Sequence, residues 1–349
     1  MKPSEFAEQV MLAGRREHQS RKTWEQYGQW ARRFGLWLMR NRGLYDSTAE
    51  IKVSSFLSWL ATRPGGCSPK TQHQALCALV FAFKKGLERP LAQMPDWVKP
   101  PHRQHLPVWL SRSEFDALSR HLTGAGLEIA QMMFGAGPRL KEVLKLRVRD
   151  LDFDAGLIII REGKGFKDRT TCFPHTLRAP MRERLERLRD LWQTDQDNDT
   201  PGVWVPDDVG RKQPHAGTRW EMQFVFPGAN LSRDPDTGII RRHHLHEDTL
   251  AKALKKATVK ARLAKRVTAH VLRHSFATAY LENGGSIHKL QELLGHKSLE
   301  TTEIYTHCIK KFAADVTSPL DVMPGNVVPF VGAVVENWSD GVMGERRTA

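Results

Sequence analysis

The sequence predicts a mainly α-helical protein with a small β-sheet, divided into two domains. Apolar and aromatic residues recur at helical spacing through residues 4–95, and a proline-rich stretch follows. Further along, two short runs with strand character stand among segments with helical patterns. Strand and helix do not alternate, and the sequence contains no internal repeat. An α+β domain that follows an all-helical one therefore fits better than a parallel α/β sheet or a repeat array.

The chain is strongly basic. Its 349 residues allow two domains, and 53 Lys and Arg against 39 Asp and Glu give a formal net charge of +14. A hydrophobic content of 40% and a charged content of 26% are ordinary for a globular protein. So large a positive excess on that background indicates a polyanionic partner more than solubility alone, and nucleic acid is the first candidate.

The cysteines and the apolar segments predict a cytoplasmic, nucleoid-associated protein. The four cysteines show no paired spacing, which argues against a disulfide framework or a zinc cluster and suits a reducing compartment. No apolar run reaches membrane-spanning length, and the N-terminus lacks the apolar core of a signal peptide.

Residues 1–95 are predicted to form a four-helix domain. The helical pattern is clearest at 22–42 and returns at 71–87. The large apolar residues of the first stripe are Trp24, Tyr27, Trp30, Phe34, Trp37 and Leu38. A stripe of this kind most often packs in a core, so we assign it to the core of this domain.

A linker is expected at 96–110. The segment PDWVKPPHRQHLP contains four prolines, and Pro100-Pro101 favours an extended backbone. Ser111 and Glu114 then have the spacing of a capping box. The second domain therefore begins with a helix and is expected to extend over 111–324.

Within the second domain we expect a helix over 139–147 and two strands at 157–161 and 170–173, joined by the turn-like GKGFKDR. Further helices are predicted at about 175–195, 247–263, 268–283, 286–294 and 300–306. Residues 325–349 are expected to form a disordered or loosely docked tail.

Six polar residues are spread along the second domain in distinct local contexts. They occur in the segments GAGPRLKEVLKL, GKGFKDR, AHVLRHSFAT, LLGH and TTEIYTH, and they are Arg139, Lys164, His270, Arg273, His296 and Tyr305. Two arginines, a lysine and two histidines provide the groups that bind a phosphodiester and move its protons, and a tyrosine hydroxyl can attack phosphorus. The set predicts DNA strand exchange without a metal ion or a nucleotide cofactor.

This order of residues resembles the tyrosine recombinases, whose signature is Arg, Lys, His-x-x-Arg, His or Trp, then Tyr. The resemblance covers roughly residues 1–323. It implies a SAM-like core-binding domain and a catalytic domain that form a C-shaped clamp around DNA. It also implies four protomers on two DNA sites, each passing a C-terminal helix to a neighbour, and residues 309–323 are the candidate exchanged segment.

The resemblance makes Tyr305 the nucleophile, which forms a 3′-phosphotyrosyl bond and frees a 5′-hydroxyl. That ester keeps the bond energy, so rejoining needs no ATP. A phenol has an unperturbed pKa near 10, so the site has to help remove its proton. His270 and His296 are candidates for that proton transfer or for a hydrogen bond to the phosphate, because histidine changes protonation near neutral pH.

Arg139 and Arg273 are expected to clamp the non-bridging phosphate oxygens, since arginine donates two parallel hydrogen bonds and stays charged. Glu142, on the same helical face as Arg139, is expected to orient an arginine. Pro138 stands where the family usually has Leu, Met or a small residue, and Gly137-Pro138 would then open the helix.

Three basic residues surround the turn between the two strands. Lys164 matches the family's lysine that reaches into the minor groove and protonates the 5′-oxygen leaving group. The alternative is a solvated turn lysine that grips the backbone. Lys167 and Arg169 are expected to contact phosphates.

Residues 203–249 look like the insertion that sets integron integrases apart within this family. The resemblance implies that this segment holds extrahelical bases of a folded single-stranded recombination site. Trp220 could stack on such a base, at about 1–3 kcal/mol per base, or belong to an ordinary core. Pro235, His243 and His244 match positions that pack around these bases in related integrases.

Other functions compete with that of an integron integrase that inserts and excises mobile gene cassettes. A phage-type or chromosome-resolving recombinase on duplex sites would not need the insertion, and a DNA-binding relative with decayed catalysis would not keep all six polar residues. A metal site at His243, His244 and His246 is disfavoured because adjacent histidines point apart on most backbones. A metal-dependent nuclease fits worst, since no carboxylate cluster with metal-ligand spacing is present.

Overall fold

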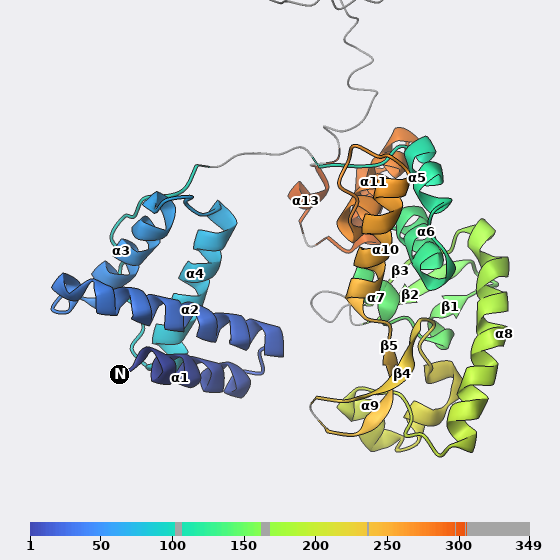
Figure 1. Ribbon diagram of the computed structural model, residues 1–349, viewed down its shortest axis with the longest axis horizontal. Helices are drawn as coiled ribbons and strands as arrows, with labels where there is room; N and C mark the ends of the chain where they lie inside the picture. The colour runs from blue at the N-terminus through green and yellow to red at the C-terminus, as the bar shows by residue number, and fades with distance from the viewer. Residues whose placement is uncertain (102–106, 162–167, 236, 297, 304, 306–349) are drawn as a thin grey trace, which may run out of the picture. The chain divides into compact units, whose positions relative to one another are not determined.

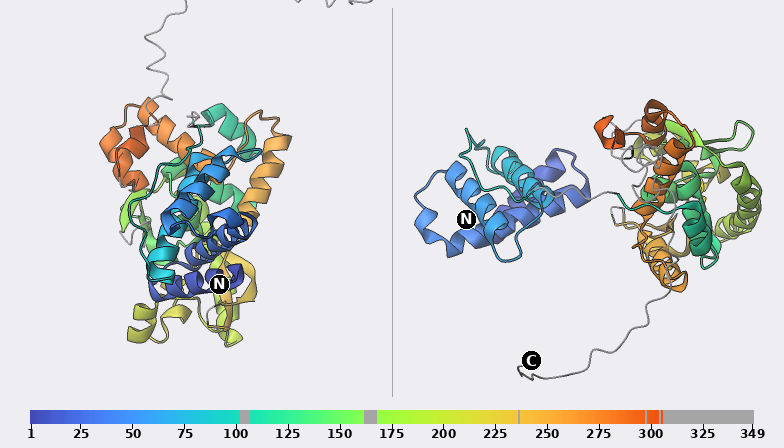
Figure 2. Two further views of the ribbon diagram at one scale, coloured as in Figure 1. Left: turned by 90° about the vertical axis from the view of Figure 1, so that its left-hand side faces the viewer. Right: turned by 90° about the horizontal axis from the view of Figure 1, so that it is seen from above.

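The chain divides into two compact units, Met1–His105 and Leu106–Ala349. In the computed structural model the first unit runs from blue to cyan and the second from green to orange (Figures 1 and 2). The segments predicted as an exchanged helix, 309–323, and as a tail, 325–349, lie outside the described residues. The structure describes residues 1–101, 107–161, 168–235, 237–296, 298–303 and 305.

The first unit has the predicted four helices, and the aromatic stripe lies in their core except for Trp24, which is only half-buried and outside that cluster. Trp30, Phe34 and Trp37 are at most 8% exposed and pack with residues of the other helices, which confirms the core assignment. Hydroxyls of Ser20, Thr48 and Ser68 accept main-chain N–H groups where the second, third and fourth helices begin. The elements are α1 (Pro3–Arg16), α2 (Arg21–Arg40), η1 (Arg42–Leu44), α3 (Ala49–Thr62), α4 (Pro69–Phe81) and the π-helical turn η2 (Ala82–Gly86).

The second unit is built around α6 (Gly124–Ala136), a helix that the sequence patterns did not predict. Its residues are nearly all small or apolar, so it has no polar face to give a helical period. Ile129, Met132 and Met133 are fully buried, and α6 packs against other helices of the second unit. These are α5 (Arg112–Ser119), α7 (Leu140–Leu144), α8 (His175–Asp197), α10 (Glu247–Lys260) and α11 (Ala269–Glu282).

The remaining helical elements of the second unit are short. Ser111 and Glu114 form the predicted capping box at the start of α5. Of the helix predicted at 300–306, residues 300–303 are helical, residue 305 lies in a turn, and residues 304 and 306 lie outside the described residues. The elements are η3 (Val148–Asp150), α9 (Asp207–Lys212), η4 (Ala216–Thr218), η5 (Trp220–Met222), α12 (Ile287–Leu294) and α13 (Glu300–Glu303).

The helix predicted over 139–147 is wrong in length, because α7 ends at Leu144. Beyond it the main chain pairs with the segment 223–225 of the insertion. The carbonyl of Leu146 accepts the Val225 N–H at 2.8 Å, and the Val148 N–H donates to the Gln223 carbonyl at 3.0 Å. Pairing with a distant segment therefore outweighs the local helical pattern.

Two small antiparallel sheets complete the second unit. The predicted strands are confirmed as β2 (Leu157–Ile160) and β3 (Arg169–Cys172), and β1 (Leu151–Asp152) adds an edge. The hairpin of β4 (Pro227–Arg233) and β5 (Ile240–His244) was not predicted, because its strands are mostly polar and carry no alternating pattern. It lies at the end of the second unit away from α13 (Figure 1).

No helix in the described part of the chain is both long enough and apolar enough to cross a membrane.

Candidate active site

Arg139 lies in the tight connection between α6 and α7. Gly137 ends α6 with a φ of 71°, and a Cβ there would come within 2.3 Å of a ring carbon of Phe276, so glycine is required. Pro138 precedes the helix instead of opening it, since Arg139 is the N-cap of α7. The Arg139 N–H donates to Glu142 Oε2 at 2.7 Å, and its Nη1 donates to Oε1 at 2.8 Å.

Glu142 binds two arginines at once. Arg169 on β3 donates through Nη1 to Oε1 at 2.9 Å and through Nη2 to Oε2 at 2.6 Å. Burial pushes the pKa of the Glu142 carboxyl upward, but hydrogen bonds and charge from Arg169 and Arg139 outweigh it, so the pKa lies below its usual value. Glu142 is therefore ionised and binds the guanidinium groups of Arg139 and Arg169.

Three consecutive carbonyls at the C-terminal end of α12 each accept a hydrogen bond from a different arginine. The pairs are Leu293 O with Arg169 Nε at 3.0 Å, Leu294 O with Arg273 Nη2 at 2.7 Å, and Gly295 O with Arg139 Nη2 at 3.3 Å. The partial negative charge at a helix C-terminus favours cations there. The end of α12 thus brings together Arg139 and Arg273, which lie far apart in sequence.

Arg273 is almost completely buried on α11. It is 5% exposed, and its Nη1 donates to the Gly137 carbonyl at 2.7 Å. Burial, and then the nearby Arg139, lower the pKa of its guanidinium to about 10. Arg273 still carries its charge at neutral pH.

His296 follows the α12 terminus and contacts Arg273. Its Nε2 lies 3.1 Å from Arg273 Nη2, and because arginine only donates, this nitrogen accepts. Nδ1 then carries the proton and donates to Thr302 Oγ1 at 2.9 Å. Burial, and next the charge of Arg273, lower the His296 pKa to about 4. His296 is thus neutral in this arrangement.

Tyr305 is 2% exposed and contacts two histidines. The His296 ring is nearly parallel to the phenol, with 6.3 Å between centroids. His274 Nδ1 lies 2.8 Å from the Tyr305 hydroxyl oxygen. His274 was not among the predicted residues, although its place directly after Arg273 and one helical turn after His270 could have indicated it. His270 is exposed, and its ring centroid is 6.5 Å from that of His274.

Of the three basic residues predicted to act at the turn between β2 and β3, Arg169 is the one that lies within the described residues. Lys164 and Lys167 lie outside the described residues. Arg169 is 11% exposed at its side chain, and each guanidinium nitrogen already has a partner in Glu142 or Leu293. This geometry supports a bracing role for Arg169 within the site more than the phosphate contact expected from the sequence.

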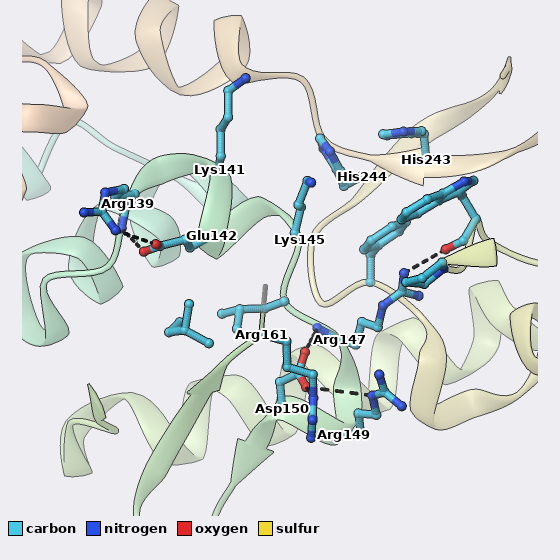
Figure 3. A pocket seen from close by; sticks show the side chains of 15 residues that line it. Arg139, Lys141, Glu142, Lys145, Arg147, Arg149, Asp150, Arg161, His243 and His244 are labelled. Carbon is cyan, nitrogen blue, oxygen red and sulfur yellow. Dashed lines mark hydrogen bonds and ion pairs between the residues drawn. The ribbon is translucent and has the colours of Figure 1, made fainter. Parts of the chain in front are cut away.

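A cavity of about 360 Å³ extends from Arg139 and Glu142 to the β4–β5 hairpin (Figure 3). Its wall on the hairpin side contains Phe224 and His243, whose rings are stacked with 6.0 Å between centroids. Several basic side chains line the rest. They are Lys141, Lys145, Arg147, Arg149 and Arg161. The cavity therefore joins a cationic surface to aromatic rings.

His243 and His244 lie together, contrary to the expectation that adjacent histidines point apart. The two histidines end β5, and their ring centroids are 4.3 Å apart because both rings pack against Phe224. Burial lowers the His244 pKa to about 4, and His244 Nδ1 lies 2.8 Å from the Leu245 carbonyl oxygen. Among the described residues, no group of three or more His, Cys, Asp or Glu is arranged to hold a metal ion.

Trp220 and Pro235 do not line this cavity. Trp220 is half-buried, with its ring 5.8 Å from that of Trp192 and under the guanidinium of Arg189 at 4.3 Å. Pro235 is exposed in the turn of the β4–β5 hairpin. Of the four insertion residues predicted to contact bases, the structure places His243 and His244 beside the arginine site.

Two family models match this chain. One, described as "Phage integrase family", matches residues 115–311, and the other, "Phage integrase, N-terminal SAM-like domain", matches residues 6–93. An "Integrase/recombinase" from Escherichia coli is 42% identical over 309 residues, which cover 88% of this chain and 90% of that protein. "Tyrosine recombinase XerA" from Thermococcus onnurineus (strain NA1) is 32% identical over 271 residues, 76% of this chain and 80% of that protein.

Solved structures share the fold. The XerH site-specific recombinase bound to palindromic difH substrate aligns with a TM-score of 0.58 at 20% identity, covering 88% of this chain and 83% of that one. The Tn1549 transposon integrase in complex with circular intermediate DNA aligns with a TM-score of 0.55 at 16% identity, covering 86% and 94%. The chain therefore belongs to the phage integrase family of tyrosine recombinases, the enzymes of site-specific DNA recombination.

Proposed function

We propose that the protein cleaves and rejoins DNA strands through a phosphotyrosyl bond to Tyr305, without a metal ion or ATP. The observation that carries this proposal is the convergence of Arg139, Arg273 and His296 at the C-terminal end of α12, with the Tyr305 ring packed against His296. Side chains from four separate segments meet there. Such a set suits a phosphodiester, which offers two charged oxygens and one electrophilic phosphorus.

In the proposed reaction, the Tyr305 oxygen attacks phosphorus and the 5′-oxygen leaves as a hydroxyl after protonation. Arg139 and Arg273 would neutralise the charge that builds on the non-bridging oxygens, an effect worth several kcal/mol in a preorganised site. We assign Lys164 as the proton donor to the leaving oxygen. His270, at the exposed start of α11, would accept the proton that Tyr305 loses as its oxygen bonds to phosphorus, or would hydrogen-bond the phosphate while solvent water takes that proton. Attack by a 5′-hydroxyl on the phosphotyrosyl ester then reseals the strand.

We further propose that the substrates are integron gene cassettes with folded single-stranded sites. The cavity beside Arg139 supports this, since Phe224, His243 and His244 offer aromatic surface for an unpaired base. Lys141, Lys145 and Arg161 lie around it and suit the phosphates that flank such a base. An ordinary duplex site has no base outside the stack to occupy the cavity. Trp220 and Pro235, away from the cavity, would meet other parts of the DNA.

On DNA, residues 1–95 would act as the DNA-binding domain and 111–324 as the catalytic domain, joined by the linker at 96–110. The proposed assembly is a tetramer on two recombination sites, with residues 309–323 passed between neighbours. The net charge of +14 supports a polyanionic partner, and its contribution should weaken strongly with salt.

Covalent trapping tests this proposal. The full-length protein is mixed, in EDTA, with labelled oligonucleotides of one sequence, either folded as a single-stranded cassette-type hairpin with bulged bases or annealed as a plain duplex. Denaturing gels then show any protein–DNA adduct, and Tyr305→Phe is the control.

An adduct that favours the hairpin and is lost in Tyr305→Phe is the expected result. An adduct on the duplex alone would support the proposed recombinase activity and rule out the proposed integron substrate. No adduct from any cognate site, with DNA binding intact, would indicate a DNA-binding protein that has lost catalysis.

A further inference from the structure

The contact between His274 and Tyr305 is not explained by the six predicted residues. His274 Nδ1 lies 2.8 Å from the Tyr305 hydroxyl oxygen, and the two ring centroids are 5.4 Å apart. His274 projects from α11 directly after Arg273, whose guanidinium contacts His296. The histidine therefore connects the nucleophile to the same helix that carries part of the phosphate site.

The surroundings of His274 keep its imidazole neutral. Burial is the largest cause, and the charges of His270 and Arg273 add to it, so that the pKa of His274 falls to about 4. A neutral imidazole carries a proton on one nitrogen and accepts through the other. Its unprotonated nitrogen is a better acceptor than a phenol oxygen, so the Tyr305 hydroxyl donates to Nδ1.

We propose that His274 is a positioning residue, which holds the Tyr305 hydroxyl by accepting its hydrogen bond at Nδ1 and so aims the oxygen for attack. The proposal rests on the proposed function, in which Tyr305 is the nucleophile. The hydrogen bond to His274 holds the phenol oxygen, and the Tyr305 ring lies parallel to that of His296. Reactions of this kind are sensitive to placement, since an error of about 1 Å can cost roughly a hundredfold in rate.

In the DNA-free protein, proton transfer from Tyr305 to His274 is unfavourable. An ordinary phenol has a pKa near 10, so transfer of its proton to an imidazole with a pKa of about 4 is unfavourable by roughly a millionfold. The bond therefore orients a neutral phenol until phosphate binding changes the balance of charge in the site.

Single-turnover cleavage by variants of His274 tests the proposal. The rate of adduct formation is measured at saturating protein, on whichever of the hairpin and duplex probes gives a Tyr305-dependent adduct with the unaltered protein. His274→Phe keeps a ring of similar size without an acceptor, and His274→Asn offers an amide oxygen near the position of Nδ1. His121→Phe, at an exposed turn after α5, is the matched control.

We expect His274→Phe to cleave about 10- to 100-fold more slowly, with unchanged DNA binding, and His274→Asn to recover most of the rate. A His274→Phe rate within about twofold of the unaltered rate would overturn the proposal. Equal losses in the Phe and Asn variants would also overturn it, because they would indicate a packing role.

A second measurement does not depend on the fold of any His274 variant. In full-length protein labelled with ¹⁵N-histidine, NMR should show His274 Nδ1 as an unprotonated acceptor whose signal shifts in Tyr305→Phe. A proton on Nδ1 would contradict the proposal. If the adduct still forms in Tyr305→Phe, then Tyr305 is not the nucleophile and the proposed role of His274 is wrong as well. If the protein only lacks a preference for the hairpin, the result for His274 remains valid.

Discussion

The guanidinium of Arg169 meets both carboxylate oxygens of Glu142, at 2.9 and 2.6 Å, with each side chain nearly buried at 11% and 9% exposure. This ion pair joins β3 to α7. Since Arg169 also holds the Leu293 carbonyl, it links β3, α7 and the end of α12.

Replacing Arg169 by Met should therefore destabilise the second unit. Glu142 would keep only Arg139, and breaking a buried pair typically costs about 3–5 kcal/mol of unfolding free energy. The exposed pair of Arg112 and Asp116 gives a matched control, because Arg112→Met should cost at most about 1 kcal/mol. Urea unfolding followed by circular dichroism measures both, and equal effects would show that Arg169 has no bracing role.

Gly137→Ala should lower both stability and cleavage. The added Cβ would clash with Phe276 at a position whose φ of 71° already disfavours alanine, and the shift would displace the carbonyl that binds Arg273. Gly124 has a similar φ of 53° but open space around it. Gly124→Ala should thus show only the backbone cost, of about 1–2 kcal/mol. If the two variants unfold at the same urea concentration, the clash is not significant.

Acidification should destabilise the second unit between about pH 6.5 and 4. His244, His274 and His296 have pKa values of about 4 in the folded protein, against an ordinary value of 6.5. The unfolded chain therefore binds more protons in this window, so stability falls as the pH falls.

Each of these shifts corresponds to at most roughly 3 kcal/mol, and solvent reduces it because the side chains are only half-buried. Urea midpoints at pH 7 and pH 5 measure the slope. His296→Gln should flatten it, while the exposed His121→Gln should leave it unchanged. If His296→Gln leaves the pH dependence of the urea midpoint unchanged, the lowered pKa assigned to His296 is wrong.

Arg139→Lys should reduce the rate of adduct formation by about a hundredfold. Lysine keeps the charge but loses the planar fork that reaches Glu142 and the Gly295 carbonyl together. The salt dependence of DNA binding should change little, because the number of charges is the same. Arg187→Lys, on the exposed surface of α8, is the control. Wild-type cleavage by Arg139→Lys would exclude Arg139 from the phosphate clamp.

His243→Ala should reduce adduct formation on the hairpin substrate but not on the duplex. If an unpaired base stacks in the cavity, loss of this ring should weaken adduct formation on the bulged hairpin by about 1–3 kcal/mol, and leave any duplex reaction unchanged. His246→Ala, exposed and outside the cavity, should affect neither probe. Equal losses on both probes would indicate that His243 does not contact an unpaired base.

The sequence predicted the elements with a clear period and missed those without one. The α2 stripe and the capping box of Ser111 are local signals, and the structure confirms both. Helix α6 and the β4–β5 hairpin carry no such signal, since the residues of α6 are nearly all small or apolar and those of the hairpin strands are mostly polar. The end of α7 could not be predicted either, because it depends on pairing with residues 223–225.

The candidate site was predictable as a set of residues but not as a network. Ordered motifs indicated Arg139, Arg273 and His296. The carbonyls that hold the arginines are main-chain atoms, which no side-chain pattern reveals. His274 was not predicted for a related reason. A histidine beside Arg273 has no assigned part in the motif, and only its distance to Tyr305 distinguishes it.

The three arginine contacts at the end of α12 have a consequence for how this enzyme tolerates mutation. Every amino acid supplies the same carbonyl, so a change of side chain at 293 or 294 removes no acceptor while the helix is kept. The fully buried Leu294 is constrained by its packing instead. Position 295 is the exception, because its φ of 63° favours glycine. The acceptors of the arginine site are thereby independent of side-chain identity on α12, and selection on Leu290 and Leu294 acts instead through their packing in the core.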